Sequence, residues 1–435
     1  MKINLKIIII YIFLFLLLFA DTISSLTNLY LITYFDEIII ILILIYSVLY
    51  SINTKKITTI SFKLLFLTLI FSIIGVLSCA LNSEFILLRV INSNFLAIKF
   101  FVIVVAIANI KIKKETSNIF LNAILFYAKI NVLVGIFNFI FPNIYYNIFP
   151  FAEKSIRYGF TAISGLFNHP GKYGWFMLAS AIISYIIYNK NKNKKKYKIF
   201  MIIFAIFALL SFRTKVVISL VMIIIYELFF KNIKKFNFSK LALVTIVISS
   251  IFLIFYDLVV NTYNLYFTSK YTLSARQALL NNGIEIMSDY FPLGVGFGKY
   301  GSWYARIYYS EYYKEYKMSK IYGLYPNNPM YATDTFWPAI FGETGFLGTI
   351  IFVYMLLFIL KKLKAKNFEN EEIINHVSFL LLLQTICESF GEPSFNSSPQ
   401  NVVVAIIIGI GLSITTTKEK ERNNENESIN NNSSI

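Results

Sequence analysis

Four cations stand next to apolar segments of this chain, at Arg157, Arg213, Lys215 and Arg276. An arginine presents a planar fork of N–H donors that matches the oxygens of a phosphate, whereas a lysine offers a point charge. A cation at membrane depth costs roughly 2.5–3.5 kcal/mol on insertion scales and tends to be functional. We therefore interpret the three arginines as catalytic phosphate-binding residues and Lys215 as substrate-binding. The alternative is that each side chain pairs with a loop carboxylate or extends towards water.

Three other side chains could transfer a proton or hold a polar group: His169, Asp334 and Glu343. His169 opens an apolar segment, where a single histidine is more often structural. Asp334 precedes Glu343 by nine residues, a rise of ~13 Å on a helix, so the two are not a close carboxylate pair. Asp334 could instead cap the helix. Glu343 lies inside an apolar run and is expected to contact an arginine or a polar substrate. All three are candidate catalytic residues.

A glycine-rich run and a tyrosine-rich tract follow Arg276 along the chain. Gly294 and Gly296 belong to the run at 292–298, which predicts a tight turn or a nest of backbone amides for an anion. No strand of a βαβ unit precedes it, so a nucleotide site is not expected. Tyr304 and Tyr308 lie in the tract at 300–331. Tyrosine rings suit sugar faces and membrane interfaces alike, and we count these four residues as candidate substrate-binding positions.

Membrane-spanning helices must position these residues. The chain has 435 residues, of which 57% are hydrophobic, whereas soluble proteins have about 45–50%. Its mean hydropathy is +0.65. Apolar runs close to the ~20 residues that span a bilayer predict an all-α integral membrane protein with about twelve transmembrane helices. The expected spans are 5–23, 37–53, 62–81, 95–110, 118–141, 170–188, 199–212, 214–230, 240–260, 337–360, 373–389 and 400–416.

The positive charges indicate how these spans are oriented. The formal net charge is +17, and most lysines fall in connections that twelve spans place on one side. By the positive-inside rule that side is the cytoplasm, which holds both termini, so we expect a bilayer partner and no nucleic acid. Residues 1–416 then form one polytopic membrane domain. It includes a large extracytoplasmic loop at 261–336, and a disordered cytoplasmic tail follows at 417–435.

The order of these motifs resembles the O-antigen ligase and polymerase superfamily, a group of membrane glycosyltransferases. The resemblance covers roughly residues 155–350 and rests on Arg157 with 165–170, 211–213, Arg276, 292–298 and 343–348. One position departs from the pattern of the ligases. Those enzymes typically carry a His-Asn pair nine residues ahead of the Glu-x-Gly motif, and this chain has Asp334 and Thr335 there.

The resemblance implies a Wzy-type polymerase at the cell membrane, with its active site on the extracytoplasmic face. Such an enzyme transfers glycan from undecaprenyl diphosphate to an incoming lipid-linked repeat unit, for O-antigen of lipopolysaccharide or for capsule. It implies no cofactor or metal, and a chain-length regulator and a flippase as further partners. Two alternatives stay open: an O-antigen ligase-type transferase, and a non-catalytic polysaccharide transporter or flippase. A transporter would favour internal repeats and charges deep in many spans, and no repeat is visible.

Overall fold

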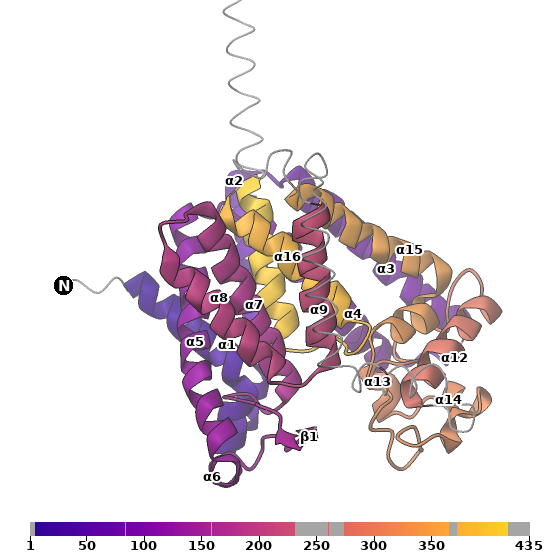
Figure 1. The fold of residues 1–435 in the computed structure, drawn as a ribbon. Coiled ribbons are helices and arrows are strands. Elements are labelled where there is room, and N and C mark those ends of the chain that lie inside the picture. Colours follow the sequence, from indigo (N-terminus) through magenta and orange to yellow (C-terminus); the bar gives the residue numbers. More distant parts are fainter. Residues whose placement is uncertain are drawn as a thin grey trace, which may run out of the picture.

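The computed structural model describes residues 5–82, 84–157, 159–230, 260, 274–364 and 372–415. Almost all regular structure in these ranges is helical, as predicted (Figure 1). The longer helices are α1 (Leu5–Thr27), α2 (Phe35–Thr54), α3 (Thr59–Asn82), α4 (Leu87–Ala108), α5 (Lys114–Ile140), α7 (Pro170–Lys190), α8 (Lys195–Leu209), α9 (Thr214–Ile225), α12 (Ala275–Asp289), α15 (Trp337–Leu363), α16 (Ile373–Glu388) and the unlabelled Gln400–Thr415. The short elements are η1 (Tyr30–Tyr34), α6 (Pro142–Ile148), β1 (Ile156–Arg157), β2 (Phe160–Thr161), the π-turn η2 (Tyr226–Phe230), α13 (Trp303–Ile307), α14 (Tyr312–Glu315) and η5 (Met318–Lys320).

Two helices form the interior of the bundle. Most residues of α7 and nearly all of Gln400–Thr415 are buried, and Figure 1 shows the latter, in yellow, in the middle of the bundle. By contrast, α2 and α3 expose large apolar side chains such as Leu42, Leu49 and Phe62. Such an apolar surface is unfavourable in water, so it is suited to the hydrocarbon core of a bilayer. The outer helices are therefore the ones that face lipid.

Six helices of the described residues are long and apolar enough to cross a membrane. They are α1, η1 together with α2, α3, α4, α5 and α15. The other described helices that overlap predicted spans are α7, α8, α9, α16 and Gln400–Thr415. The predicted span at 240–260, the first part of the large loop and the tail at 417–435 lie outside the described residues, except for residue 260. The chain is thus a multi-pass membrane protein, and the count of twelve spans stays a prediction.

A lysine within the predicted fourth span is neutralised by neighbouring carboxylates. Lys99 of α4 is buried, and its Nζ lies 2.5 Å from Asp36 Oδ2 and 3.2 Å from Glu37 Oε1 at the start of α2. An isolated buried charge is costly, and removing one partner of such a group is strongly destabilising. The ion pairs therefore fasten α2 to α4.

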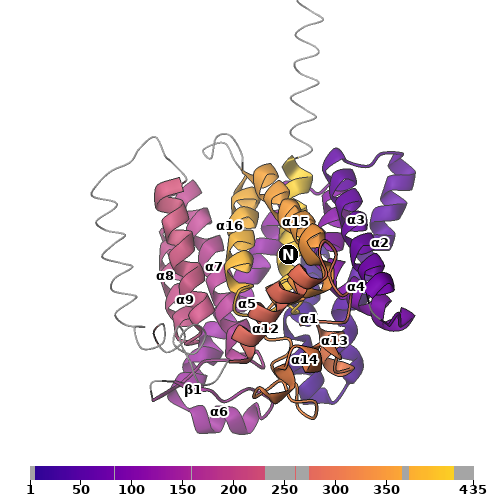
Figure 2. The ribbon, with the colours of Figure 1, turned by 90° about the vertical axis from the view of Figure 1, so that its right-hand side faces the viewer.

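The extramembrane elements gather at one end of the bundle. Both views place α6, β1 and α12–α14 together at that end (Figures 1 and 2). The loop segment has a small core of its own, which includes Leu279, Ile286, Tyr300, Tyr313 and Met318. The apolar positions within 274–291 predict an amphipathic helix, and the structure has α12 there. The described part of the large loop is thus an ordered unit packed against α15.

The glycine-rich run packs against a break in α15. Gly345 has φ +59° and ψ −154°, which interrupts the helix, and this conformation is essentially restricted to glycine. The Val295 N–H donates to Gly342 O (2.8 Å) and the Gly296 N–H to Glu343 O (2.9 Å). A Cβ on Gly294 would lie 2.2 Å from Gly342 O. Two motifs that are separate in the sequence therefore form one close backbone contact.

We expect Gly345→Ala to destabilise the protein. Its new Cβ would lie 2.3 Å from Leu293 O, and a strained backbone of this kind costs about 1–3 kcal/mol before that clash is counted. Thermal unfolding of the purified protein in detergent should show an apparent Tm lower by several degrees. Gly391→Ala is the control, because the nearest atom to its added Cβ is 3.7 Å away. Equal Tm values for the two variants would contradict this account of the break.

Candidate functional site

Glu153 connects two of the predicted catalytic residues. Its Oε1 accepts from Arg213 Nη2 and its Oε2 lies against His169 Nε2, both at 2.9 Å. His169 caps α7, where its Nδ1 accepts from the Gly171 N–H at 2.9 Å. Because Nδ1 is an acceptor, the imidazole proton belongs on Nε2, which donates to Glu153. One carboxylate thus orients the histidine and the arginine together.

The electrostatics of Glu153 follow from this bridge. The hydrogen bond from His169 lowers the pKa of Glu153 most, burial opposes it, and the charge and hydrogen bond of Arg213 lower it further, to about 2. A carboxylate at this position therefore stays ionised across the physiological pH range. It holds Arg213, whose side chain is 16% exposed. The Arg213 Nε is buried with no hydrogen-bond partner among the described residues.

Arg157 reaches the same hairpin from the other side. It ends β1, pairs in register with Phe160 of β2, and donates from Nη1 to Phe212 O at 3.1 Å. Phe212 has φ +49° and directly precedes Arg213, the N-cap residue of α9. With its 15 residues, α8 rises only about 22 Å, less than the ~30 Å hydrocarbon core. The hairpin between α8 and α9 is thus expected to lie at membrane depth, with Arg213 on it and Arg157 hydrogen-bonded to it.

Lys215 has carboxylate partners of its own. Its Nζ is hydrogen-bonded to Glu392 and lies 3.6 Å from Glu388 Oε2, and its side chain is 8% exposed. Burial would raise the pKa of Glu392, but the Lys215 ammonium and its hydrogen bond outweigh burial and lower it. These contacts join α9 to the end of α16. They favour a positioning role for Lys215 over direct substrate contact, which stays a prediction.

Arg276 and Asp334 form a second part of the site. Arg276 is in the first turn of α12, and its Nε donates to Asp334 Oδ2 at 2.5 Å. About a third of each side chain is exposed. Asp334 lies two residues before Phe336, whose N–H donates to Ser389 O at 3.4 Å. Since Ser389 follows Glu388, a partner of Lys215, both parts of the site meet the end of α16.

Glu343 is buried away from these cations. Its Oε1 accepts from the Tyr300 N–H (3.1 Å) and from Ser302 Oγ (2.5 Å), and only 3% of the residue is exposed. Glu343 is expected from the sequence to contact an arginine or a polar substrate, and in the structure its hydrogen bonds come from Tyr300 and Ser302. Next to it is Arg89 of α4, whose Nε donates to Gly298 O at 2.7 Å. The Arg89 Nη2 is buried without a hydrogen-bond partner among the described residues.

The four predicted substrate-binding loop residues divide into two pairs. Gly294 packs against α15 and Gly296 against Cys79 of α3, and the amide of Gly296 is already used by Glu343 O. Tyr304 and Tyr308 have stacked rings with centroids 6.4 Å apart. The Arg89 guanidinium lies 5.3 Å from the Tyr308 ring centroid, and Tyr308 is half exposed. The tyrosines thus offer an accessible aromatic surface, and the glycines serve packing. A substrate contact by any of the four stays a prediction.

Sequence reasoning missed Glu153, Glu392 and Arg89. Their contacts join segments far apart in the chain, such as Arg213 with Glu153 and Arg89 with Gly298. The sequence does contain a weak signal for Glu153. It is a carboxylate in a loop on the predicted outer side, where the candidate arginines and Lys215 also lie, and a loop carboxylate is an expected partner for such cations. Arg89 lies in a connection on the predicted outer side and could have been included with the other arginines.

The fold and the site define a multi-pass membrane protein with a cluster of cations at one end. Residues 159–353 match the model of a protein family described as O-antigen ligase. This match confirms the resemblance of that segment to the O-antigen ligase and polymerase superfamily. A search of curated proteins finds no match. The matched segment includes His169, Arg213, Arg276, Asp334 and Glu343 and begins two residues after Arg157.

Glu153→Gln should lower stability in a pH-dependent manner. The pKa of Glu153 is lowered from 4.5 to about 2, so its ionised form stabilises the fold above pH 4.5, and this contribution is lost as the pH falls towards 2. We expect the wild-type protein to have the higher apparent Tm at pH 5–7, and the difference to shrink below pH 4.5. Glu115→Gln, at an exposed position of α5, controls for net charge. A Tm difference that does not vary with pH would refute the bridge.

Proposed function

We propose that this protein is a polysaccharide repeat-unit polymerase that acts on lipid-diphosphate-linked glycans at the outer face of the cell membrane. The family match supports a membrane glycan enzyme. The observation that carries the proposal is Arg213 on a recessed hairpin to which Arg157 is hydrogen-bonded, with a buried guanidinium donor at Arg213 that has no partner among the described residues. A diphosphate linked to a lipid such as undecaprenol carries its charge at the same membrane level.

The hairpin arginines suit the leaving group of this reaction. An acceptor hydroxyl oxygen attacks the anomeric carbon of the growing glycan, and the bond from that carbon to the diphosphate oxygen breaks. The diphosphate keeps the bonding electrons, and the acceptor gives up its proton. Donors that are fixed before the reaction stabilise the charge that develops on the leaving oxygens. Arg157, Arg213 and Arg276 are assigned this role.

Asp334 is the candidate base that best suits the acceptor proton. It is about one-third exposed and lies against Arg276, whereas Glu343 is buried under two hydrogen bonds. His169 already donates from Nε2 to Glu153. A diphosphate leaves readily, so modest proton transfer is enough. Asp334, which is paired with Arg276, stands where the ligases carry a histidine. This difference favours a polymerase over a ligase.

The test of this function is deletion of the gene followed by gel analysis of the surface glycan. Loss of a polymerase should collapse a ladder of glycan lengths to a single repeat unit on its carrier. Loss of a ligase would leave long polymer that no longer reaches its final carrier. Loss of a flippase would leave the single repeat unit on the cytoplasmic side, out of reach of an external glycan probe. Either of the last two results would overturn the polymerase.

Arg276→Ala should remove long polymer while single repeat units still appear. The loss of one fixed donor at a developing charge lowers a rate by about 10²–10³-fold. Arg276→Lys should be intermediate, since an ammonium cannot fork across two phosphate oxygens. Arg306→Ala is the matched control, because that arginine of the same loop lies over the Trp303 ring. Normal polymer from a normally expressed Arg276→Ala variant would exclude this residue from the reaction.

A further inference from the structure

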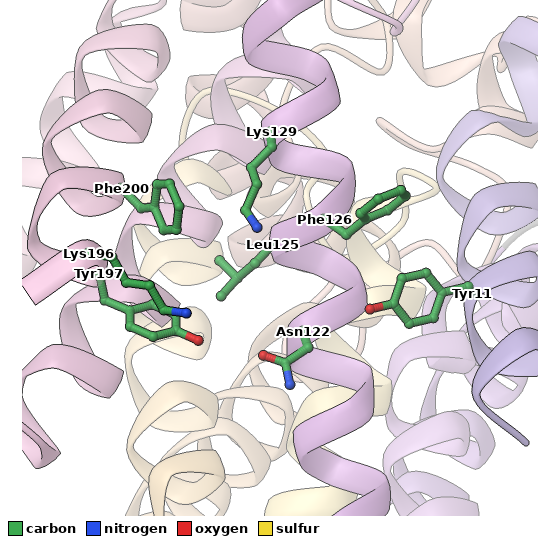
Figure 3. A pocket seen from close by; sticks show the side chains of 8 residues that line it. All are labelled: Tyr11, Asn122, Leu125, Phe126, Lys129, Lys196, Tyr197 and Phe200. Atoms are coloured by element: carbon green, nitrogen blue, oxygen red, sulfur yellow. The ribbon is translucent and has the colours of Figure 1, made fainter. Parts of the chain in front are cut away.

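A cavity on the far side of the bundle from α12 opens between α1, α5 and α8. Its volume is about 280 Å³ and its lining includes Tyr11, Asn122, Lys129, Lys196, Tyr197 and Phe200. Figure 3 shows the ammonium groups of Lys129 and Lys196 and the hydroxyl of Tyr197 pointing into the space between α5 and α8. The Asn122 amide lies beside them. Four polar groups from two helices thus converge on one volume.

Lys129 is placed where a lysine is costly. It lies 15 residues after Lys114, the first residue of α5, which corresponds to a rise of about 22 Å. Helical side chains lean towards the helix N-terminus, and the Lys129 side chain follows that direction towards Asn122 (Figure 3). Its Nζ lies 5.0 Å from the centroid of Phe200. A cation at such depth tends to serve a function.

The cavity has an unbalanced charge. Among the described residues, its lining holds two lysines and no carboxylate. Lys196 is the second residue of α8, next to the lysine-rich turn that follows α7, and its Nζ lies 5.5 Å from the Tyr197 ring centroid. This turn is on the predicted cytoplasmic side, at the opposite end of α7 from His169. The cavity therefore has the composition of an anion site near the inner membrane surface.

Apolar surface continues from the cavity along both helices. Ile199, Ile202 and Ile206 of α8 are exposed, and so are Phe126 and Leu133 of α5. A soluble anion makes no use of such surface, but acyl chains do. Basic pockets between transmembrane helices on the cytoplasmic side are suited to anionic lipid headgroups. The polar cavity and the apolar flanks together match the two parts of a phospholipid.

We propose that this cavity binds one anionic phospholipid of the cytoplasmic leaflet. The headgroup phosphate accepts from Lys129, Lys196 and Tyr197, and the acyl chains lie along the exposed faces of α5 and α8. The site is separate from the proposed catalytic residues. Because α8 leads directly to the hairpin that carries Arg213, a lipid wedged at the start of α8 also helps to fix that hairpin.

The test is native mass spectrometry of the full-length protein in detergent, titrated with phosphatidylglycerol or with zwitterionic phosphatidylethanolamine. We expect one phosphatidylglycerol to be retained by the wild-type protein in preference to phosphatidylethanolamine. Each lysine beside an anionic headgroup contributes on the order of a fivefold change in affinity. The double variant Lys129→Gln/Lys196→Gln should therefore bind it roughly 25-fold more weakly, and Lys129→Arg/Lys196→Arg should retain it.

The control is Lys192→Gln/Lys194→Gln, which removes the same charge from the turn just before α8, outside the cavity lining. It should bind phosphatidylglycerol as the wild-type protein does. Three results would overturn the proposal: equal weakening in the control, equal retention of phosphatidylethanolamine, or full displacement of the lipid by glycerol phosphate. The last would indicate a site for a soluble phosphate. Apparent Tm values for all variants verify that each is folded.

Discussion

The carboxylate of Glu153 is the contact on which the arrangement of the candidate site depends. It holds Arg213 with one oxygen and His169 with the other, and so joins the loop before β1 to the starts of α9 and α7. Without this carboxylate, the contact that holds the Arg213 guanidinium and the His169 imidazole on one group would be lost. A carboxylate partner offsets part of the desolvation cost of a cation at the membrane and fixes the direction of its hydrogen-bond donors.

The opposite part of the site is fixed by backbone contacts. The break at Gly345 lets the run at 292–298 approach α15, and the buried Glu343 holds Tyr300 and Ser302. This frame sets the start of α15, with Asp334 just ahead of it. The hydrogen bond from the Phe336 N–H to Ser389 O then connects the start of α15 to the end of α16. Rigid packing on one side and ion pairs on the other therefore position the cations.

Sequence reasoning found the helical class, the ordered helix α12 and three of the arginines to which the structure gives polar partners. It could do so because apolar runs, amphipathic spacing and cations near lipid are local patterns. The partners of those arginines were not predictable in the same way. Glu153 is 60 residues from Arg213, and Asp334 is 58 residues from Arg276, so packing alone creates these pairs. The glycine run predicts a turn or an anion nest. Its packing role depends on contacts with Gly342 and Gly345, which only the structure shows.

The pairing of each arginine with an oxygen of the protein is compatible with binding a phosphate. A guanidinium has five N–H donors, and the contacts described use Nη1 of Arg157, Nη2 of Arg213 and Nε of Arg276. The carboxylate or carbonyl on one edge restrains the side chain, so less conformational entropy is lost when a ligand arrives. It also reduces the cost of a cation at membrane depth while the site is empty. A diphosphate brings more negative charge than one carboxylate, so it can share these groups without displacing the residues that orient them.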